Sequence, residues 1–202
     1  MAAYVNPCKD TGIYKSLEWC PGQTSLPGIR QRVFYIPKKH IVKWPELPKL
    51  EGAVDMATVA TYKGDFTLAS EKKWLAIDIL SAKSNTTSES QGEKPSKTFL
   101  NKSLLKYAGT DAAATGFCRQ ANIDELIFAV QQRDGKFRIQ GSEAFEQDIK
   151  ISQTSGEGDT GTAGTDLEVS TTDVCPAPFY VGKLETEMGD ISGADGSPHS
   201  PG

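Results

Sequence analysis

Residues 109–141 constrain the fold of this chain more than any other stretch, because the apolar pattern there changes once from helical to strand-like. Small and apolar side chains first recur at helical spacing, at Ala113, Ala114, Phe117, Cys118 and Ala121. This stripe predicts a helix over about 110–121 that lies flat on a sheet. We expect Thr110 to be its N-cap and Asp111 to lie in the first turn, where negative charge suits the helix dipole.

A buried hairpin is predicted directly after this helix. Every residue from Leu126 to Val130 is apolar, which is the pattern of a strand covered on both faces. Asp134-Gly135 is a strong two-residue hairpin signal, because both residues tolerate positive φ. Phe137 and Ile139 continue the pattern on the return strand. The helix and hairpin therefore predict the structural centre of the subunit, but they carry no chemistry.

Most of the remaining chain is typical of short strands separated by turns. The predicted strands cover residues 29–36, 57–62, 66–68, 73–80, 148–154 and 165–171, and residues 174–182 close the fold. A total of about eight to ten strands with one helix indicates a mainly β protein. We predict a β-sandwich or barrel with one flanking α-helix, a long polar hairpin and extended terminal arms.

Residues 81–98 are polar throughout and allow two interpretations. They form either a disordered loop or two polar strands around a turn at residues 92–95. A hairpin that is polar on both faces has little to bury by itself. Such a hairpin makes more sense lining a wet surface or pairing with another chain.

Composition divides the chain into three regions. Residues 1–55 form an irregular arm with one strand, because prolines at 37, 45 and 48 exclude a helix or a central strand. The apolar residues of this arm pack either on their own domain or across a neighbouring subunit. Residues 56–182 form the β core, and residues 183–202 predict a flexible acidic tail rich in Gly, Ser and Pro.

Charge is distributed unevenly along the chain. Residues 1–140 carry 20 Lys and Arg against 14 Asp and Glu, whereas residues 141–202 carry 2 against 12. The balances of +6 and −10 give the net charge of −4, which offers no reason to expect tight nucleic-acid binding. The acidic region is either a solvated tail or a surface that meets the basic region of a neighbouring copy.

Catalytic, metal and cofactor motifs are not evident. The two histidines stand apart from any nucleophile pattern, and no cysteine belongs to a Cys-x-x-Cys pair. The glycine-rich residues 155–164 lack a following helix or Gly-Lys-Ser/Thr, which excludes a phosphate loop. They also lack EF-hand spacing. A carboxylate pair of a glycosidase stays an open alternative, because such pairs are distant in the chain, but the sequence points to no particular pair. Single tryptophans can stack on sugars but are more often packing residues. We expect no catalytic residue, no cofactor and no metal.

The N-terminal residues lack the basic and apolar regions of a signal peptide, so free thiols and an intracellular origin are expected. A Cys8–Cys20 bridge stays open as an alternative. No apolar run approaches the roughly 20 residues that span a bilayer.

The order of the motifs resembles the major tail tube proteins of long-tailed bacteriophages, in the form found in phages and prophages of Bacteroidetes. The resemblance covers residues 29–182. It rests on these segments in sequence: IRQRVFYIPKKHIVKWPELP, GDFTL, KKWLAIDIL, SESQGEKPSKTF, GTDAAATGFCRQAN, DELIFAVQQRDGKFRIQGSE, ISQTSGEGDTGTAGTDLEVS and APFYVG.

The resemblance implies a non-enzymatic virion protein that assembles in the bacterial cytoplasm into stacked hexameric rings. One sheet from each subunit would join a barrel around a lumen through which DNA passes without sequence-specific binding. The implied partners are further copies of the chain and tape measure, terminator and baseplate proteins. Candidate inter-subunit contacts are Trp44, Pro45, Leu47, Glu89, Gln91, Glu93, Lys94, Lys97 and Phe99. Asp166 and Glu168 are candidates for the lumen-facing surface, where acidic side chains would repel DNA.

Three alternatives stay open. The first is a tail terminator, baseplate, sheath-like or other ring-forming virion protein, which would form one closed ring. The second is a non-catalytic carbohydrate-binding β-sandwich module, which would need export. The third is a hydrolase with an unrecognised site.

Overall fold

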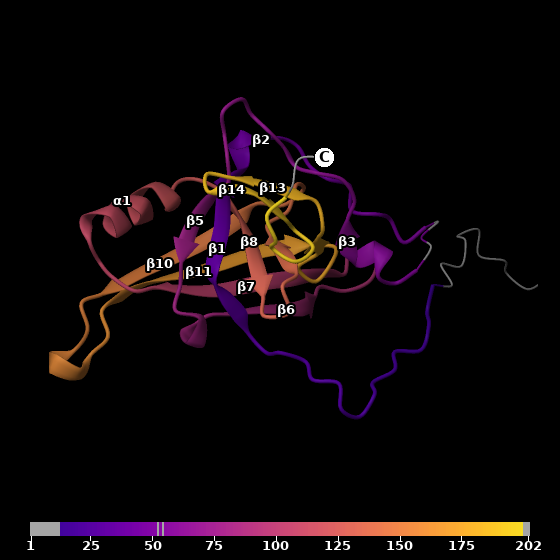
Figure 1. Ribbon diagram of the computed structural model, residues 1–202, viewed down its shortest axis with the longest axis horizontal. Coiled ribbons are helices and arrows are strands. Elements are labelled where there is room, and N and C mark those ends of the chain that lie inside the picture. The colour runs from indigo at the N-terminus through magenta and orange to yellow at the C-terminus, as the bar shows by residue number, and fades with distance from the viewer. Residues whose placement is uncertain (1–12, 52, 54, 200–202) are drawn as a thin grey trace, which may run out of the picture.

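The protein is mainly β in a computed structural model that describes residues 13–51, 53 and 55–199. Strands account for 43% of the chain and helices for 12%, and the sheets do not close into a barrel. The predicted β-sandwich-like fold with one helix is therefore confirmed, and the barrel alternative is not seen. Figure 1 shows the two main sheets, with the helix at one end of them.

The larger sheet has six strands. Their order is β3 (Thr61–Tyr62), β12 (Phe179–Tyr180), β9 (Phe137–Gln140), β8 (Leu126–Gln132), β1 (Ile29–Pro37) and β5 (Leu75–Asp78). Neighbouring strands are antiparallel except β12 and β3. The centre of this sheet is therefore the predicted hairpin with β1 beside it.

The second sheet has four antiparallel strands. Their order is β10 (Gln147–Thr154), β11 (Gly164–Asp173), β7 (Thr98–Tyr107) and β6 (Asn85–Gln91). Two small pairs complete the β structure: β2 (Ile41–Lys43) with β4 (Thr67–Leu68), and β13 (Lys183–Thr186) with β14 (Gly189–Ser192). The 3₁₀ turns are η1 (Lys38–His40), η2 (Thr58–Ala60), η3 (Ser81–Lys83) and η4 (Gly158–Thr160), and the α-helix is α1 (Ala112–Ala121).

The six-stranded sheet separates two apolar cores, which explains the uninterrupted apolar run of β8. Phe128 and Val130 lie in the core between the two large sheets, with Leu105 and Leu167 from the four-stranded sheet. Ile127 and Ala129 point to the opposite face, where the second core includes Trp74, Tyr180 and Leu184. Burial of β8 on both faces is therefore confirmed.

The helix begins one residue later than predicted. Asp111, not Thr110, is the N-cap, and its Oδ1 accepts a hydrogen bond from the backbone N–H of Ala114 at 2.7 Å. A carboxylate at this position both satisfies a free N–H and places negative charge at the positive end of the helix. Ala114 and Ala121 are buried under the helix, and the Phe117 ring meets the Tyr35 ring edge-on with centroids 5.2 Å apart.

The predicted flexible tail from residue 183 is contradicted by the β13–β14 hairpin. Leu184 is 0% exposed in the second core, and Thr186 is 1% exposed. The backbone N–H of Trp74 donates to the Glu185 carbonyl at 2.8 Å, which ties this hairpin to the strand region before β5. The error arose because one buried leucine in a polar stretch gives too weak an apolar pattern to predict a strand.

The predicted strand at residues 57–62 is also corrected. Only β3 is a strand, and η2 precedes it. Asp55 Oδ1 accepts hydrogen bonds from the backbone N–H and the hydroxyl of Thr58, at 2.8 and 2.9 Å. Local hydrogen bonds from Asp and Thr side chains compete with strand pairing in this way.

Candidate assembly surface

The four-stranded sheet ends in two open edges. Among the described residues, neither β6 nor β10 has a hydrogen-bonded strand on its outer side. Most side chains of both strands are exposed, and the sequence of β6, NTTSESQ, is polar along its whole length. Unpaired N–H and C=O groups along a strand edge are a ready template for pairing with another chain.

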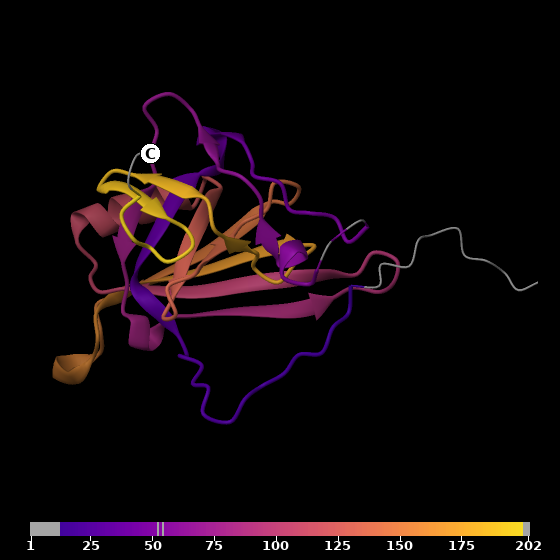
Figure 2. The ribbon, with the colours of Figure 1, turned by 45° about the vertical axis from the view of Figure 1, so that its right-hand side comes forward.

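The segment at residues 81–98 holds β6 and a turn, so it is neither a loop throughout nor the two polar strands of the second interpretation. The return strand β7 begins only at Thr98, at the end of the segment. β6 pairs with β7 from Asn85–Leu104 to Gln91–Thr98. The turn at residues 92–97 is exposed, and the hairpin extends beyond the rest of the sheet (Figure 2). Gln91 Nε2 donates to Thr172 Oγ1 at 3.0 Å, so the far end of β6 is also tied to β11.

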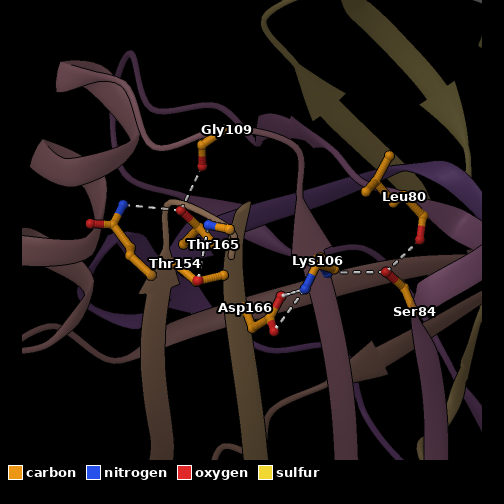
Figure 3. A network of polar contacts seen from close by, with 9 residues as sticks. Leu80, Ser84, Lys106, Gly109, Thr154, Thr165 and Asp166 are labelled. Carbon is orange, nitrogen blue, oxygen red and sulfur yellow. Dashed lines mark hydrogen bonds and ion pairs between the residues drawn. The ribbon is translucent and has the colours of Figure 1, made fainter. Parts of the chain in front are cut away.

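The other end of β6 is held by side-chain hydrogen bonds (Figure 3). The Ser84 hydroxyl donates to the Leu80 carbonyl at 2.9 Å and accepts from the Lys106 N–H at 3.0 Å. Across the next ladder, the Thr165 hydroxyl donates to the Gly109 carbonyl at 2.9 Å. The two Ser84 bonds hold the start of β6 to the sheet, and the Thr165 bond ties β11 to the loop that follows β7.

The outer face of the four-stranded sheet has mixed charge. The register places Lys102, Lys106 and Lys150 on the same face as Glu89, Asp148, Asp166 and Glu168. Lys106 Nζ lies 2.8 Å from Asp166 Oδ1 (Figure 3), and Lys102 Nζ lies 3.6 Å from Glu89 Oε2. Asp166 and Glu168, the two candidate lumen residues, therefore lie on one surface. That surface also carries lysines, so it is not uniformly acidic.

The predicted contact residues fall into two groups. Glu93, Lys94 and Lys97 lie exposed at the hairpin turn. Glu89 and Gln91 lie on the outer face of β6, and Phe99 is half-buried on the inner face of β7.

The second group packs on its own domain, which is the first of the two alternatives that the sequence left open. Pro45 is buried, and Trp44 and Leu47 pack against the chain's own second core. The Trp44 ring meets the Phe66 ring edge-on with centroids 5.2 Å apart. The chain therefore has apolar surface of its own for these side chains to cover, and their contact with another copy stays a prediction.

Two features of the surface were not predicted from the sequence. The open edge of β10 is one, because a period-two pattern does not show which strands end a sheet. The second is the exposure of large apolar side chains on the irregular segment at residues 13–28, which runs outside the fold as an extended loop (Figure 1). This segment exposes Tyr14, Leu17 and Trp19 by 90%, 89% and 71%.

Within the described part of the chain, no three His, Cys, Asp or Glu side chains gather as a metal site would require. Cys20, Cys118 and Cys175 are free thiols, and Cys8 lies outside the described residues, so the predicted alternative of a Cys8–Cys20 bridge stays a prediction. No helix in the described ranges has the length and apolarity needed to span a membrane.

Comparisons with known proteins find no relative: no family model, no curated protein and no solved structure matches this chain.

Proposed function

We propose that this protein is a structural subunit that assembles into rings through the edges of its four-stranded sheet, and that stacked rings form the tail tube of a long-tailed bacteriophage. The observation that carries the proposal is the pair of open edges on one antiparallel sheet. The resemblance of the sequence to tail tube proteins supplies the biological setting. The tape measure, terminator and baseplate proteins are proposed partners on the same basis.

The direction of the strands favours head-to-tail pairing. A sheet with an even number of antiparallel strands has edge strands that run in opposite directions, so β6 and β10 are antiparallel. When β10 of one copy meets β6 of the next copy in the same orientation, the new pair is again antiparallel. Repeated contacts of this kind close into a ring when the rotation between copies is suitable.

The lengths of β6 and β10 allow several backbone hydrogen bonds in this contact. β6 has 7 residues and β10 has 8, so the two edges match in length. Their pairing would form roughly seven backbone hydrogen bonds, each contributing about 0.5–1.5 kcal/mol net. Closure of the ring satisfies both edges of every subunit, which leaves no template for further pairing within the sheet.

The mixed charge of the outer face suits a surface past which DNA moves. Strong binding of DNA requires lysines and arginines that neutralise phosphates. Here Lys106 and Lys102 are paired with Asp166 and Glu89, so few free cations are presented. We place Asp166 and Glu168 on the lumen-facing surface for this reason, in a neutral rather than an acidic setting.

Proline substitutions on β6 test the proposal. N–H groups alternate between the two sides of an antiparallel strand, so one of Thr87 and Ser88 directs its N–H to β7 and the other to the open edge. Proline is tolerated on an edge strand only where its N–H faces solvent. Each residue is replaced separately by proline, and the two variants are controls for each other.

The expected result is that one proline variant stays as stable as the wild type in urea but forms no rings in negative-stain electron microscopy. The other variant loses stability because it lacks a β6–β7 hydrogen bond. Wild-type protein should form rings that stack into tubes, and single unstacked rings would favour a terminator. Assembly of the stable variant at wild-type concentration would contradict the edge contact.

A further inference from the structure

Seven buried polar atoms lack a hydrogen-bond partner among the described residues and come from one region between the two large sheets. They belong to five residues, as follows: Arg138 Nε, Gln140 Nε2 and Oε1, Gln147 Nε2 and Oε1, Thr171 Oγ1, and Asp173 Oδ2. Buried polar groups in folded proteins nearly always have partners, so a group of this size requires an explanation.

The register places these side chains on facing surfaces. Gln140 pairs with Phe128 and Arg138 pairs with Val130 across β8 and β9, so both polar side chains share the face of β8 that looks toward the four-stranded sheet. From the other side, Gln147 and Thr171 are direct cross-strand partners on β10 and β11. Asp173 follows Thr171 by two residues and therefore points to the same face.

Four of these residues are closed off from bulk solvent. Gln140 is 0% exposed, Thr171 2%, Asp173 4% and Gln147 9%. The Leu167 and Val169 side chains fill the adjoining part of the same inter-sheet space and are each 1% exposed. The interior between the sheets is thus apolar near the helix and polar toward the opposite end of β11.

The chemistry of the seven atoms identifies the ligand. Arg138 Nε and the two amide nitrogens are donors, the two amide oxygens and the Asp173 oxygen are acceptors, and the Thr171 hydroxyl is both. A metal ion uses acceptors only, and an anion uses donors only. Water is the small ligand that satisfies donors and acceptors together.

We infer that the inter-sheet space bounded by Gln140, Gln147 and Thr171 binds a cluster of ordered water molecules that bridges β9 to β10 and β11. A buried water makes about three hydrogen bonds, so seven atoms call for roughly two or three waters. The cluster is part of the contact between the sheets, in the place that apolar side chains occupy near the helix.

An open cleft lies beside Arg138. Its Nη1 donates to the carbonyls of Pro176 and Ala177 at 3.3 and 3.0 Å, and its guanidinium lies 3.9 Å from the centre of the Phe179 ring. The same arginine lines a cleft of about 380 Å³ together with Thr86, Ser88 and the two carbonyl-bearing residues. Arg138 therefore borders both the cleft and the buried cluster.

Replacing Gln140 by Met tests the inference through the sign of a stability change. Met matches the length of Gln and has no amide. If waters bridge Gln140 to the other sheet, the Gln140→Met variant leaves them with too few partners and its urea midpoint falls. If the amide is dry and unsatisfied, removing it relieves a penalty and the midpoint rises. Gln147→Met serves as a second variant from the opposite sheet, and the exposed Gln23→Met controls for the chemical change itself.

A crystal structure of the wild-type protein completes the test. We expect waters about 2.7–3.2 Å from the amide atoms of both Gln140 and Gln147. The inference requires lowered midpoints in both Met variants together with these waters. An unchanged or raised midpoint overturns it, and so does an amide-to-amide contact between Gln140 and Gln147 with no water between them.

Discussion

Replacing Leu184 by Ala distinguishes an ordered C-terminal hairpin from the flexible tail that composition alone predicts. Leu184 is 0% exposed and lies in the second core with Phe66, Trp74 and Tyr180. The substitution removes three buried carbon groups, which at about 0.8 kcal/mol each gives a transfer cost of roughly 2.4 kcal/mol. The rings around this site leave a cavity that adds to the cost, so we expect a total loss of about 3–4 kcal/mol.

The assay is urea unfolding followed by tryptophan fluorescence, with thermal unfolding as a second measurement. A loss of this size corresponds to a fall in melting temperature of about 6–16 °C, at about 2–4 °C for each kcal/mol. The control is Val181→Ala, because Val181 is 52% exposed and lies three residues away. Exposed substitutions of this kind usually stay within about 0.5 kcal/mol of the wild type. If Leu184→Ala matches the Val181→Ala control, the hairpin is not part of the core and our description of it fails.

Three further substitutions test separate parts of the structure. Asp111→Ala should lower the free energy of unfolding in urea by about 1 kcal/mol, because it removes the N-cap, whereas Thr110→Ala should lower it much less. Equal losses in the two variants would contradict the assignment of Asp111 as the N-cap. Burial raises the pKa of Asp173 to about 6 from 3.8, so its contribution to stability is full below the lower value and is lost as the pH rises through the higher one. In the wild type, this titration lowers the free energy of unfolding by at most roughly 3 kcal/mol between about pH 4 and 6. Asp173→Asn should therefore reduce the dependence of stability on pH in this range. An unchanged dependence would mean that another group causes it. Replacing residues 92–97 by Asn-Gly should leave a subunit that is folded by circular dichroism but forms no tubes. Tubes of normal length would show that the hairpin turn is not part of the assembly surface.

The sequence pattern predicted an element best where one physical cause, such as burial on both faces, determined its residues. β8 was predictable because burial on both faces requires an uninterrupted apolar run, and Asp134-Gly135 marked its turn. The helix was predictable from its stripe, but not its first residue, since Thr110 and Asp111 are both good caps. The choice between them depends on backbone geometry that the sequence does not show.

Prediction failed where tertiary contacts decided the outcome. The sequence around Trp44 and Leu47 fits both an arm that binds another chain and a segment that packs on its own domain, and only the position of Phe66 and its neighbours shows that they cover their own core. Gln140 and Gln147 carry no pattern that separates an interior polar cluster from an exposed strand. The exposed edges of β6 and β10 likewise follow from the strand order and not from the strands themselves.

Chemical crosslinking between β6 and β10 of different copies is the most direct test of the ring contact. Thr87 and Lys150 lie exposed near the middle of the two edge strands, and both are replaced by Cys in one chain whose exposed Cys20 is changed to Ser. Within one subunit these positions are separated by three strand spacings, about 14 Å or more. A bis-maleimide with a reach of roughly half that distance therefore joins them only between copies.

Pairing of β6 with β10 predicts a ladder of crosslinked multimers on a denaturing gel that ends at the size of one closed ring. Chains carrying only Thr87→Cys or only Lys150→Cys should give no ladder, because each ring contact joins the two different edges. A double variant that stays monomeric on the gel at concentrations where the protein assembles would contradict the pairing of β6 with β10.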